Sequence, residues 1–509
     1  MTGFRPLLAA AALSALLHSF SGTTALAQAT ADNFVVAVAE EPDTLDLTST
    51  GHAPGARVSL ENITEGLWRT TTDGKVVPGL ASFELAEDGM SVLFRLREGV
   101  KFHSGDEFTA EDVVFSHERM AKRAPQYVRR ARNVDRLEIV DKHTVRLVFS
   151  TPDAGMLPAR GFSIASKAYF DRVGEEQFVR HPVGTGPYEF VSYTPGTSLV
   201  LKRFDGYWGD KPPVENATIR FVREATTRVA QLQAGEVGLT MDVPYVDAAP
   251  LKQAGFGTEL LAAHPTVGIQ FLNTNPDVPW HDPRVRRAMA HAIDRQAIIN
   301  GLLQGVPKVS ETVTEGELGY DPSIEPNAFD PALARKLLAE AGYPQGFDMP
   351  LHVWGGAFAG LRETAEAVVL YLQQVGIRAQ VQTLDASQFL TMLREQIAAP
   401  NGRYVGVSAM PWANQSDPIE ALTIAFYSRS PFAAYRNPAV DTLIAKANTL
   451  LDPQARGEVL REAFALMHED TAIVPLWNFV AVYAMAPGVR FTPTQKWFPV
   501  VQLRDVTFD

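Results

Sequence analysis

The stretch of residues 181–222 constrains the fold of this chain more than any other. Its opening letters, H-P-V-G-T-G-P-Y-E-F, bring Gly184, Gly186 and Pro187 close together. Glycine allows close backbone approach and proline fixes its own φ, so the combination predicts a tight, extended segment and excludes a helix. Residues 188–193 then alternate large apolar with polar side chains, which is typical of a half-buried strand.

A turn and two more strands follow in the same stretch. The letters T-P-G-T at 194–197 predict a turn with proline second and glycine third. Residues 198–203 are predicted to return as a strand, and residues 217–222 to form a third strand after Pro212 and Pro213. We therefore expect an antiparallel meander, which needs a partner for its apolar face and supplies no catalytic group.

Length and charge limit the class of protein. The chain has 509 residues, of which 46% are hydrophobic and 20% charged, so it is long enough for two or three globular domains. The net charge is −12 and the pI is about 5.5, which argues against nucleic acid or an anionic membrane as a partner.

The first residues are typical of a secretion signal. Arg5 supplies a positive charge, residues 7–17 are apolar, and A-L-A at 25–27 offers a cleavage site, with A-Q-A at 27–29 as a second option. We therefore interpret residues 1–27 as a signal peptide. There is no cysteine, which excludes disulfides and a lipid-anchored N-terminal cysteine. The mature protein is expected to be free in the periplasm of a Gram-negative cell.

The order of the motifs resembles one family. After G-T-G-P-Y-x-F and the hairpin come K-R-x-D-x-Y-W-G at 202–209 and P-x-x-x-x-A-x-I-x-F at 212–221. V-K-F-H-S-G-D at 100–106 and D-P-R-V-R-R-A-M-A-H-A-I-D-R at 282–295 continue the match. This order is similar to that of family 5 of the bacterial extracellular solute-binding proteins, the peptide- and nickel-type receptors of ABC importers.

The resemblance implies an α/β fold: a bilobal periplasmic binding protein of type II, cluster C-like, with mixed sheets, an extra small domain and a hinge cleft. The crossovers near Gly268 and near residues 484–489 are expected to form the hinge. The implied domains are domain I at 28–76, 184–267 and 486–509, domain II at 77–183, and domain III at 268–485.

Several local features admit a metal or acid–base interpretation. E-E-P-D-T-L-D-L at 40–47 is rich in carboxylates, but no histidine stands at ligand spacing, so we expect a solvated loop turned by proline. His103 and His117 are likewise expected to be structural. A recurrent family pattern, A-x-x-x-x-L-x-x-G-E-x-D, ends here either at Gly238 or, delayed, at Asp242.

Domain III is expected to alternate strands and helices. Residues 267–275 predict a strand ending in polar amides, and residues 281–295 a helix with Asp282 as N-cap and proline at the next position. Residues 351–354 and 377–384 predict strands that flank an amphipathic helix at 361–375. This strand–helix–strand order predicts parallel pairing.

The ligand is expected to lie between the lobes. M-P-W-A-N-Q-S-D-P at 410–418 is similar to the family's W-x-x-D-x-x-D-P loop, whose first acid pairs with a peptide's α-ammonium in peptide-type members. Here amides replace that acid, which favours a longer, modified or less charged ligand. The candidate residues are Trp412 as an aromatic wall, Asn414 and Gln415 as polar contacts, Gly51 and His52 opposite them, and Asp417, which either contacts the ligand or orders its own loop.

The motifs of common enzymes are absent from the sequence. We find no G-x-S-x-G, no G-x-x-x-x-G-K-[ST] and no H-E-x-x-H, so we predict no catalytic residue, no cofactor and no metal site. The predicted function is capture of peptides or peptide-like solutes for inner-membrane ABC permease subunits, by a monomer. The alternatives are a receptor for a nickel chelate, a sugar or an opine, or a periplasmic peptide-binding chaperone or sensor.

Overall fold

The computed structural model describes residues 30–48, 54–71, 75–123, 133–153, 163–310, 312–313, 315–355, 358–410, 417–494 and 500–509. A mixed sheet of ten strands runs through this part of the chain, in the order β14-β13-β15-β12-β16-β11-β1-β10-β9-β8. Its strands are β1 (Phe34–Val38), β8 (Tyr188–Thr194), β9 (Ser198–Arg203), β10 (Asn216–Phe221), β11 (Leu239–Thr240), β12 (Gly257–Phe271), β13 (Phe347–Trp354), β14 (Ile377–Leu384), β15 (Val405–Met410) and β16 (Ile473–Met485).

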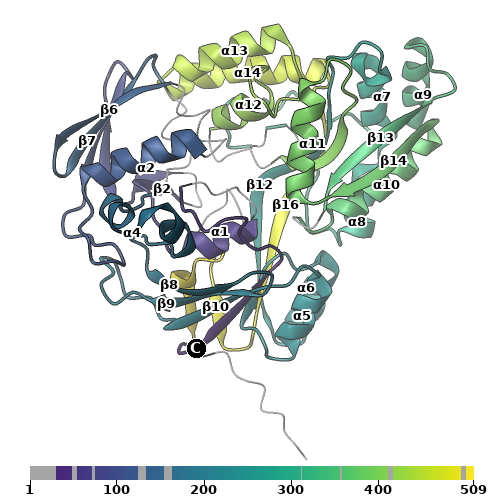
Figure 1. The fold of residues 1–509 in the computed structure, drawn as a ribbon. Coiled ribbons are helices and arrows are strands. Elements are labelled where there is room, and N and C mark those ends of the chain that lie inside the picture. Colours follow the sequence, from purple (N-terminus) through teal and green to yellow (C-terminus); the bar gives the residue numbers. More distant parts are fainter. Residues whose placement is uncertain are drawn as a thin grey trace, which may run out of the picture.

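Helices cover the two ends of this sheet separately (Figure 1). Around β1 and β8–β11 lie α1 (Pro54–Leu60), α5 (Ala225–Gln233) and α6 (Tyr245–Gln253). Around β13–β15 lie α7 (Pro283–Ala292), α8 (Arg295–Leu302), α9 (Pro331–Glu340), α10 (Leu361–Gln374) and α11 (Ala386–Ala398), with α12 (Ile419–Ala425), α13 (Pro438–Thr449) and α14 (Pro453–Glu469) beyond them.

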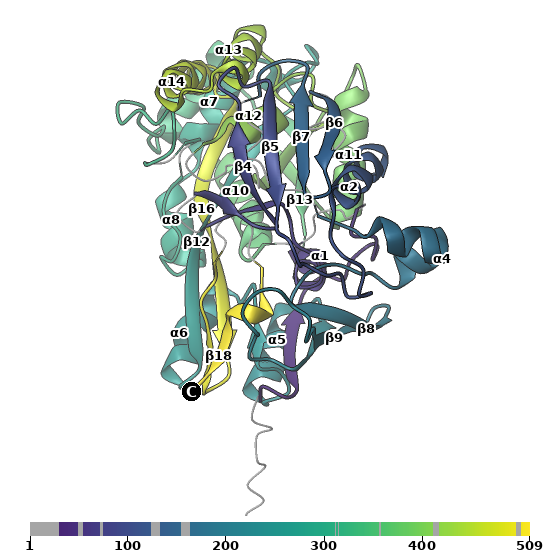
Figure 2. The same ribbon diagram turned by 90° about the vertical axis from the view of Figure 1, so that its left-hand side faces the viewer.

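A second sheet forms a smaller unit with its own hydrophobic core. Its four strands follow the order β4-β5-β7-β6 and stand side by side in Figure 2. The elements of this unit are β4 (Ala81–Leu85), β5 (Ser91–Leu96), β6 (Val134–Asp141), β7 (Thr144–Phe149), α2 (Ala110–Arg123) and α4 (Lys167–Arg180). The two-stranded sheets are β2 (Trp68–Thr70) with β3 (Val76–Pro78), and β17 (Val489–Phe491) with β18 (Val506–Phe508).

The predicted meander is confirmed as β8, β9 and β10. Gly196 in its first turn has φ 68°, and the Thr197 amide donates to the Thr194 carbonyl at 3.0 Å. The glycine before the meander is required by close packing: a Cβ on Gly184 would lie 2.2 Å from the carbonyl oxygen of Ile63. The G-T-G-P letters therefore encode a backbone-to-backbone contact between distant segments.

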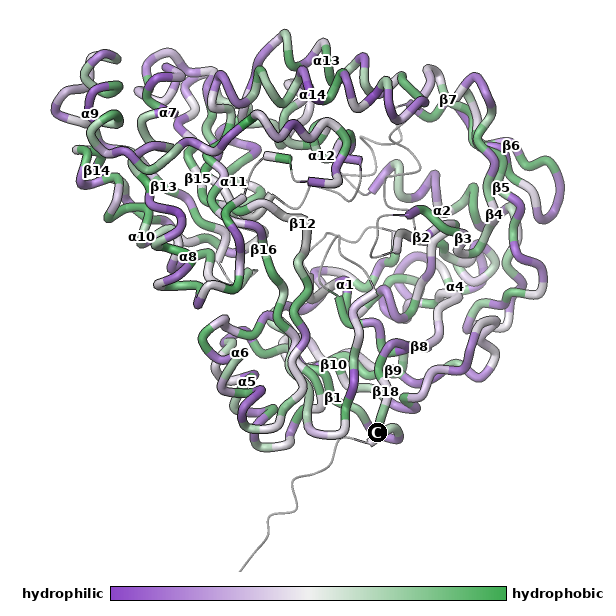
Figure 3. Tube along the Cα trace, turned by 180° about the vertical axis from the view of Figure 1, so that it is seen from behind, coloured by the Kyte–Doolittle hydropathy of each residue, from purple (hydrophilic) through white to green (hydrophobic). Residues whose placement is uncertain are grey.

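Strands β12 and β16 join the two ends of the large sheet. They pair antiparallel from Gly257↔Met485 to Gln270↔Ile473 and run side by side in Figure 3. β16 is buried along almost its whole length. The strand predicted at 267–275 thus begins ten residues earlier, at Gly257. Pro265 has no N–H for the ladder, and the register shifts between Ala262 and Thr266. A proline at this position interrupts the residue pattern from which a strand would be predicted.

The helix predicted over 281–295 is two helices. Helix α7 ends at Ala292, and Ile293 has extended backbone angles. The carboxylate of Asp294 then accepts a hydrogen bond from the Ala297 amide at 2.9 Å and begins α8. The predicted N-cap of the first helix is correct, since the Arg284 amide donates to Asp282 at 2.8 Å. The local capping preference of Asp294 outweighs the continuous helical pattern.

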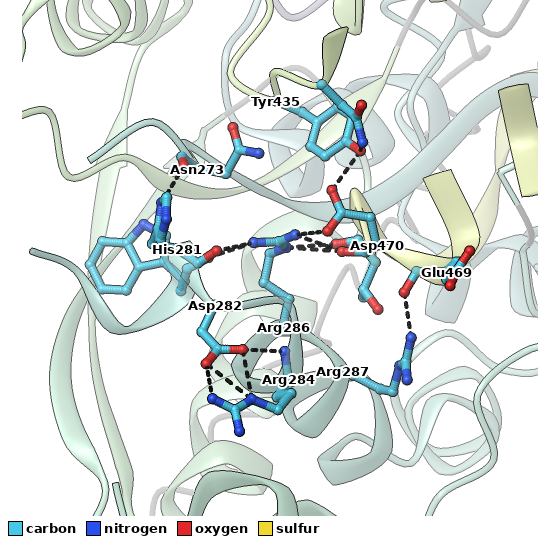
Figure 4. Close-up of polar contacts among 12 residues, drawn as sticks. Asn273, His281, Asp282, Arg284, Arg286, Arg287, Tyr435, Glu469 and Asp470 are labelled. Carbon is cyan, nitrogen blue, oxygen red and sulfur yellow. Dashed lines mark hydrogen bonds and ion pairs between the residues drawn. The ribbon is translucent and has the colours of Figure 1, made fainter. Parts of the chain in front are cut away.

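One buried arginine of this motif joins α7 to the turn before β16 (Figure 4). Arg286 is 1% exposed and donates to the carbonyls of Trp280 and His281 and to the Asp470 carboxylate, at 2.9, 2.8 and 2.7 Å. The Tyr435 hydroxyl donates to the same carboxylate at 2.6 Å. The arginine-rich letters of this segment therefore serve packing.

None of the described helices combines the length and the apolar character needed to cross a membrane.

Candidate ligand-binding site

Two sets of parallel strands end at two edges of the large sheet. Strand β1 pairs parallel with β10 and β11, so their carboxyl ends share one edge, called here the β1 edge. Strand β13 pairs parallel with β14 and β15, so their carboxyl ends share another, the β13 edge. In open α/β sheets, ligands bind outside the carboxyl ends of the strands.

The register of β16 shows that these edges face one another. At one end Thr240 of β11 pairs with Ala484, and at the other Thr266 pairs with both Asn478 and Met410 of β15. β11 and β15 approach this stretch of the central strands from opposite directions. From Asn478 to Ala484 is six residues, which corresponds to roughly 20 Å of strand. The carboxyl ends of β11 and β15 are therefore separated by a distance of that order along β16.

The binding residues predicted from the sequence lie on two segments that follow β1 and β15 in the chain. Gly51 and His52 follow β1 in the chain, and Trp412, Asn414 and Gln415 follow β15. All five residues lie outside the described part of the chain, so their contacts with a ligand remain a prediction.

Asp417 lies inside the described part and is held by protein groups. Its carboxylate accepts hydrogen bonds from the Ile419 amide at 3.1 Å and from Arg456, whose Nη2 lies 2.6 Å from Oδ2. Burial raises the pKa of Asp417, and the guanidinium of Arg456 counteracts that shift. These contacts fit the second of the two predicted roles, in which Asp417 orders its own loop.

The carboxylate-rich segment after β1 was expected to be solvated, and this expectation is wrong. Asp46 is 2% exposed and accepts from the guanidinium of Arg119 at 2.7 Å. Arg119 also donates to Thr48 at 2.9 Å and to both oxygens of Glu175. Arg119 of α2 thereby links the segment to Glu175 of α4. The sequence around Asp46 does not indicate this contact, because the arginine lies on a distant helix.

Two acidic side chains lie together at the β1 edge. Glu40 follows β1, and Asp242 follows the neighbouring β11. Burial first, and then the Asp242 charge, raise the pKa of Glu40 to about 7. Burial raises the pKa of Asp242 to about 6, although the Arg228 charge opposes the shift. Asp242 is 7% exposed and has a left-handed φ of 55°, which is uncommon for a residue other than glycine.

The arginine beside these acids is occupied by backbone groups. The Arg228 guanidinium donates to the carbonyls of Val222 and Arg223 at 2.8 Å each, and to the carbonyl of Asp242 at 3.0 Å. It therefore ties together the chain segments that follow β10 and β11. Its charge lowers the pKa values of both acids, whereas its hydrogen bonds go to backbone carbonyls.

The β13 edge carries a buried tryptophan and one acid. Trp354 ends β13, is 6% exposed, and stacks on Phe389 with ring centroids 5.7 Å apart. Its Nε1 is buried and has no hydrogen-bond partner among the described residues. Asp385 follows β14, caps α11, and its charge contributes to the raised pKa of Glu40.

Glu40, Asp242 and Trp354 were not predicted from the sequence as candidate site residues. The available signal was positional, since each stands at or just after the carboxyl end of a strand that proved to be parallel. The His103 ring bonds the Gly186 carbonyl at 2.9 Å, and burial lowers the pKa values of His103 and His117 to about 4. No described group of three His, Asp or Glu could hold a metal ion.

Comparisons with known proteins agree with this geometry. The model of the bacterial extracellular solute-binding proteins, family 5, matches residues 75–433. The glutathione-binding protein GsiB of Salmonella typhi is 30% identical over 487 residues, which cover 91% of each chain.

Two solved structures share the fold over almost the whole chain. DppA of Helicobacter pylori, in complex with the peptide STSA, has a TM-score of 0.82 at 23% identity and covers 94% of this chain and 98% of its own. AgaA of A. tumefaciens R10, in complex with agropinic acid, has a TM-score of 0.80 at 27% identity, with 94% and 99% covered. The predicted bilobal binding-protein fold is confirmed.

Proposed function

The chain belongs to family 5 of the bacterial extracellular solute-binding proteins, and on that premise we propose that it captures a peptide or peptide-like solute between the β1 and β13 edges. The facing carboxyl ends of the two strand sets are the observation that carries this proposal. The receptor releases its solute unchanged to inner-membrane permease subunits of an ABC importer. It acts in the periplasm, after removal of residues 1–27, as a monomer without catalytic activity.

Closure of the two lobes is the proposed mechanism. A ligand that contacts both edges only when they are close shifts the open–closed equilibrium by its differential affinity. The hinge lies in β12 and β16, where the register shifts between Ala262 and Thr266 and again between Val267 and Gly268. A contact far from the hinge supports the proposal, since the turn at Gly89 packs against Leu451 between α13 and α14.

The chemical class of the solute has two candidates. The similarity to GsiB favours a short peptide such as glutathione. The similarity to AgaA, at 27% identity, favours agropinic acid or a related compound as the second candidate. The amides of the 410–418 loop, in place of an acid, are compatible with either.

A ligand screen on the purified mature protein tests the proposal. Its probes are glutathione, the peptide STSA, agropinic acid and a nickel–histidine chelate, each measured by thermal shift and by small-angle scattering. A true ligand raises Tm by mass action and reduces the radius of gyration. Unchanged Tm and superimposable scattering curves with all four probes at millimolar concentration would contradict capture by closure. Release of a chemically altered probe would contradict the non-catalytic role.

A further inference from the structure

The acids at the β1 edge lack the partners that buried carboxylates normally have. The Oε2 atom of Glu40 is buried without a hydrogen-bond partner in the described part of the chain. The Asp242 carboxylate is influenced by burial and by the Arg228 charge, with no hydrogen bond contributing, and the side chain is more than nine-tenths buried. Buried charged groups are normally paired, because an unpaired one costs several kcal/mol.

Glu40 and Asp242 lie just beyond the ends of two adjacent strands. Ala37 pairs with Thr240, so Glu40 and Asp242 leave adjacent strands two to three residues beyond the same rung of the sheet. Glu40 interacts electrostatically with Asp242 on its own side and with Asp385 at the β13 edge. Two carboxyl groups at the ends of adjacent strands, with no hydrogen bonds of their own among the described residues, form a receptor for a cation.

We propose that Glu40 and Asp242 bind the ammonium group of the solute, as a subsite at the β1 edge. This proposal rests on the proposed function and makes it more specific. A primary ammonium offers three donors, enough for one hydrogen bond to each carboxylate and one more. The bound cation replaces the repulsion between the two acids with charge-assisted hydrogen bonds, so an amine-bearing solute gains affinity that its acetylated form does not.

The neighbouring arginines do not hydrogen-bond the two carboxylates, so both can bind an ammonium group. The Nη1 and Nη2 atoms of Arg228 donate hydrogen bonds to three backbone carbonyls, and the Arg223 side chain is exposed. Tyr245 of α6 and Tyr483 of β16 are the remaining titratable groups beside Asp242, and burial raises the pKa of each phenol, so they stay neutral. The three acids Glu40, Asp242 and Asp385 outnumber the two arginines whose charges act on Glu40, so the local charge is net negative when all three acids are ionised.

The test compares amine and N-acetyl forms of the same probe by calorimetry at pH 8. Glutathione and the peptide STSA are each measured with their N-acetyl derivatives, on the wild type and on Glu40→Gln and Asp242→Asn. Each substitution is expected to weaken the amine form about 10- to 100-fold and to leave the acetyl form unchanged. Asparagine tolerates the left-handed backbone of position 242, so the second variant is expected to fold.

A matched control is Glu41→Gln. The Glu41 carboxylate already accepts from the Tyr193 hydroxyl and the Gly196 amide, at 2.7 Å each, and no affinity change is expected. Equal loss of both probe forms in the Glu40 and Asp242 variants would overturn the subsite, as would unchanged affinity. Equal wild-type affinity for amine and acetyl forms would overturn the subsite but leave the capture function standing. Failure of the wild type to bind any amine-bearing probe would overturn both.

A measurement on the wild type alone tests the proposal even if the variants fail to fold. Affinity for the amine form is expected to fall as the pH drops from 8 to 5, because both acids take up protons, while affinity for the acetyl form stays level. Parallel pH profiles for the two forms would overturn the subsite.

Discussion

Asp417 and Arg456 form a buried ion pair at the carboxyl end of the predicted binding loop. Arg456 Nη2 lies 2.6 Å from Asp417 Oδ2, and the two side chains are 7% and 8% exposed. Arg456 also donates to the Leu451 carbonyl, so the pair connects the start of α12 to the segment before α14. The loop is therefore anchored on one side by the core of its own lobe.

Substitution Asp417→Ala is expected to destabilise the protein by about 3–5 kcal/mol, because it leaves the Arg456 charge buried and unpaired. Thermal unfolding of the ligand-free protein measures the effect as a lower Tm. The control is Asp348→Ala, which removes an ion pair with Arg378 that is 71% and 54% exposed and should cost no more than about 1 kcal/mol. Equal losses from both would contradict a buried structural role for Asp417.

Substitution Trp412→Ala is expected to weaken solute binding and to abolish most of the tryptophan fluorescence change on binding, if this side chain is an aromatic wall of the site. Titration of the probe that raises Tm most provides the measurement. The control is Trp208→Phe, which changes a tryptophan whose indole N–H donates to Glu65 at 2.7 Å. Unchanged affinity and fluorescence response in Trp412→Ala would show that the site is misplaced.

The stability of the ligand-free protein should depend on Glu40 between about pH 4 and 7. Its pKa is raised from 4.5 to about 7, so the folded state binds more protons in this window and stability falls as the pH rises. The shift corresponds to about 3 kcal/mol once Glu40 is ionised. His103, with a pKa lowered to about 4, acts in the opposite direction over the same window.

The difference between wild type and Glu40→Gln isolates this contribution. The variant should be more stable than the wild type at pH 8, and the difference should shrink as the pH approaches 4. Denaturation midpoints measured at half-unit pH steps provide the comparison. A difference that does not vary with pH would contradict a raised pKa for Glu40.

Substitution Gly184→Ala should destabilise far more than Gly196→Ala. A Cβ at position 184 would meet the Ile63 carbonyl at 2.2 Å, and backbone atoms cannot move aside cheaply. At position 196 a Cβ meets nothing within 4 Å, so only the left-handed φ of 68° opposes it, which costs about 1–2 kcal/mol. Expression yield and Tm of the two variants decide between them, and similar Tm values would contradict the close packing.

Residues with strong local preferences were predicted correctly. The T-P-G-T turn, the cap at Asp282 and the parallel strand–helix–strand unit of β13, α10 and β14 follow from backbone chemistry and side-chain period, which act over a few residues. The full length of β12 was missed, because Pro265 interrupts the pattern and only pairing with β16 holds the strand together.

By itself the sequence determined the class of fold, through the order of its turns and glycines and through its apolar periodicities, since these are local properties. Only the tertiary structure decided which charges are buried. Glu40 and Asp242 are 202 residues apart in the chain, and nothing near either one indicates that parallel pairing of β1 with β11 places them together. The pairing of distant strands, and the loss of water that follows from it, turned two ordinary acids into a candidate binding site.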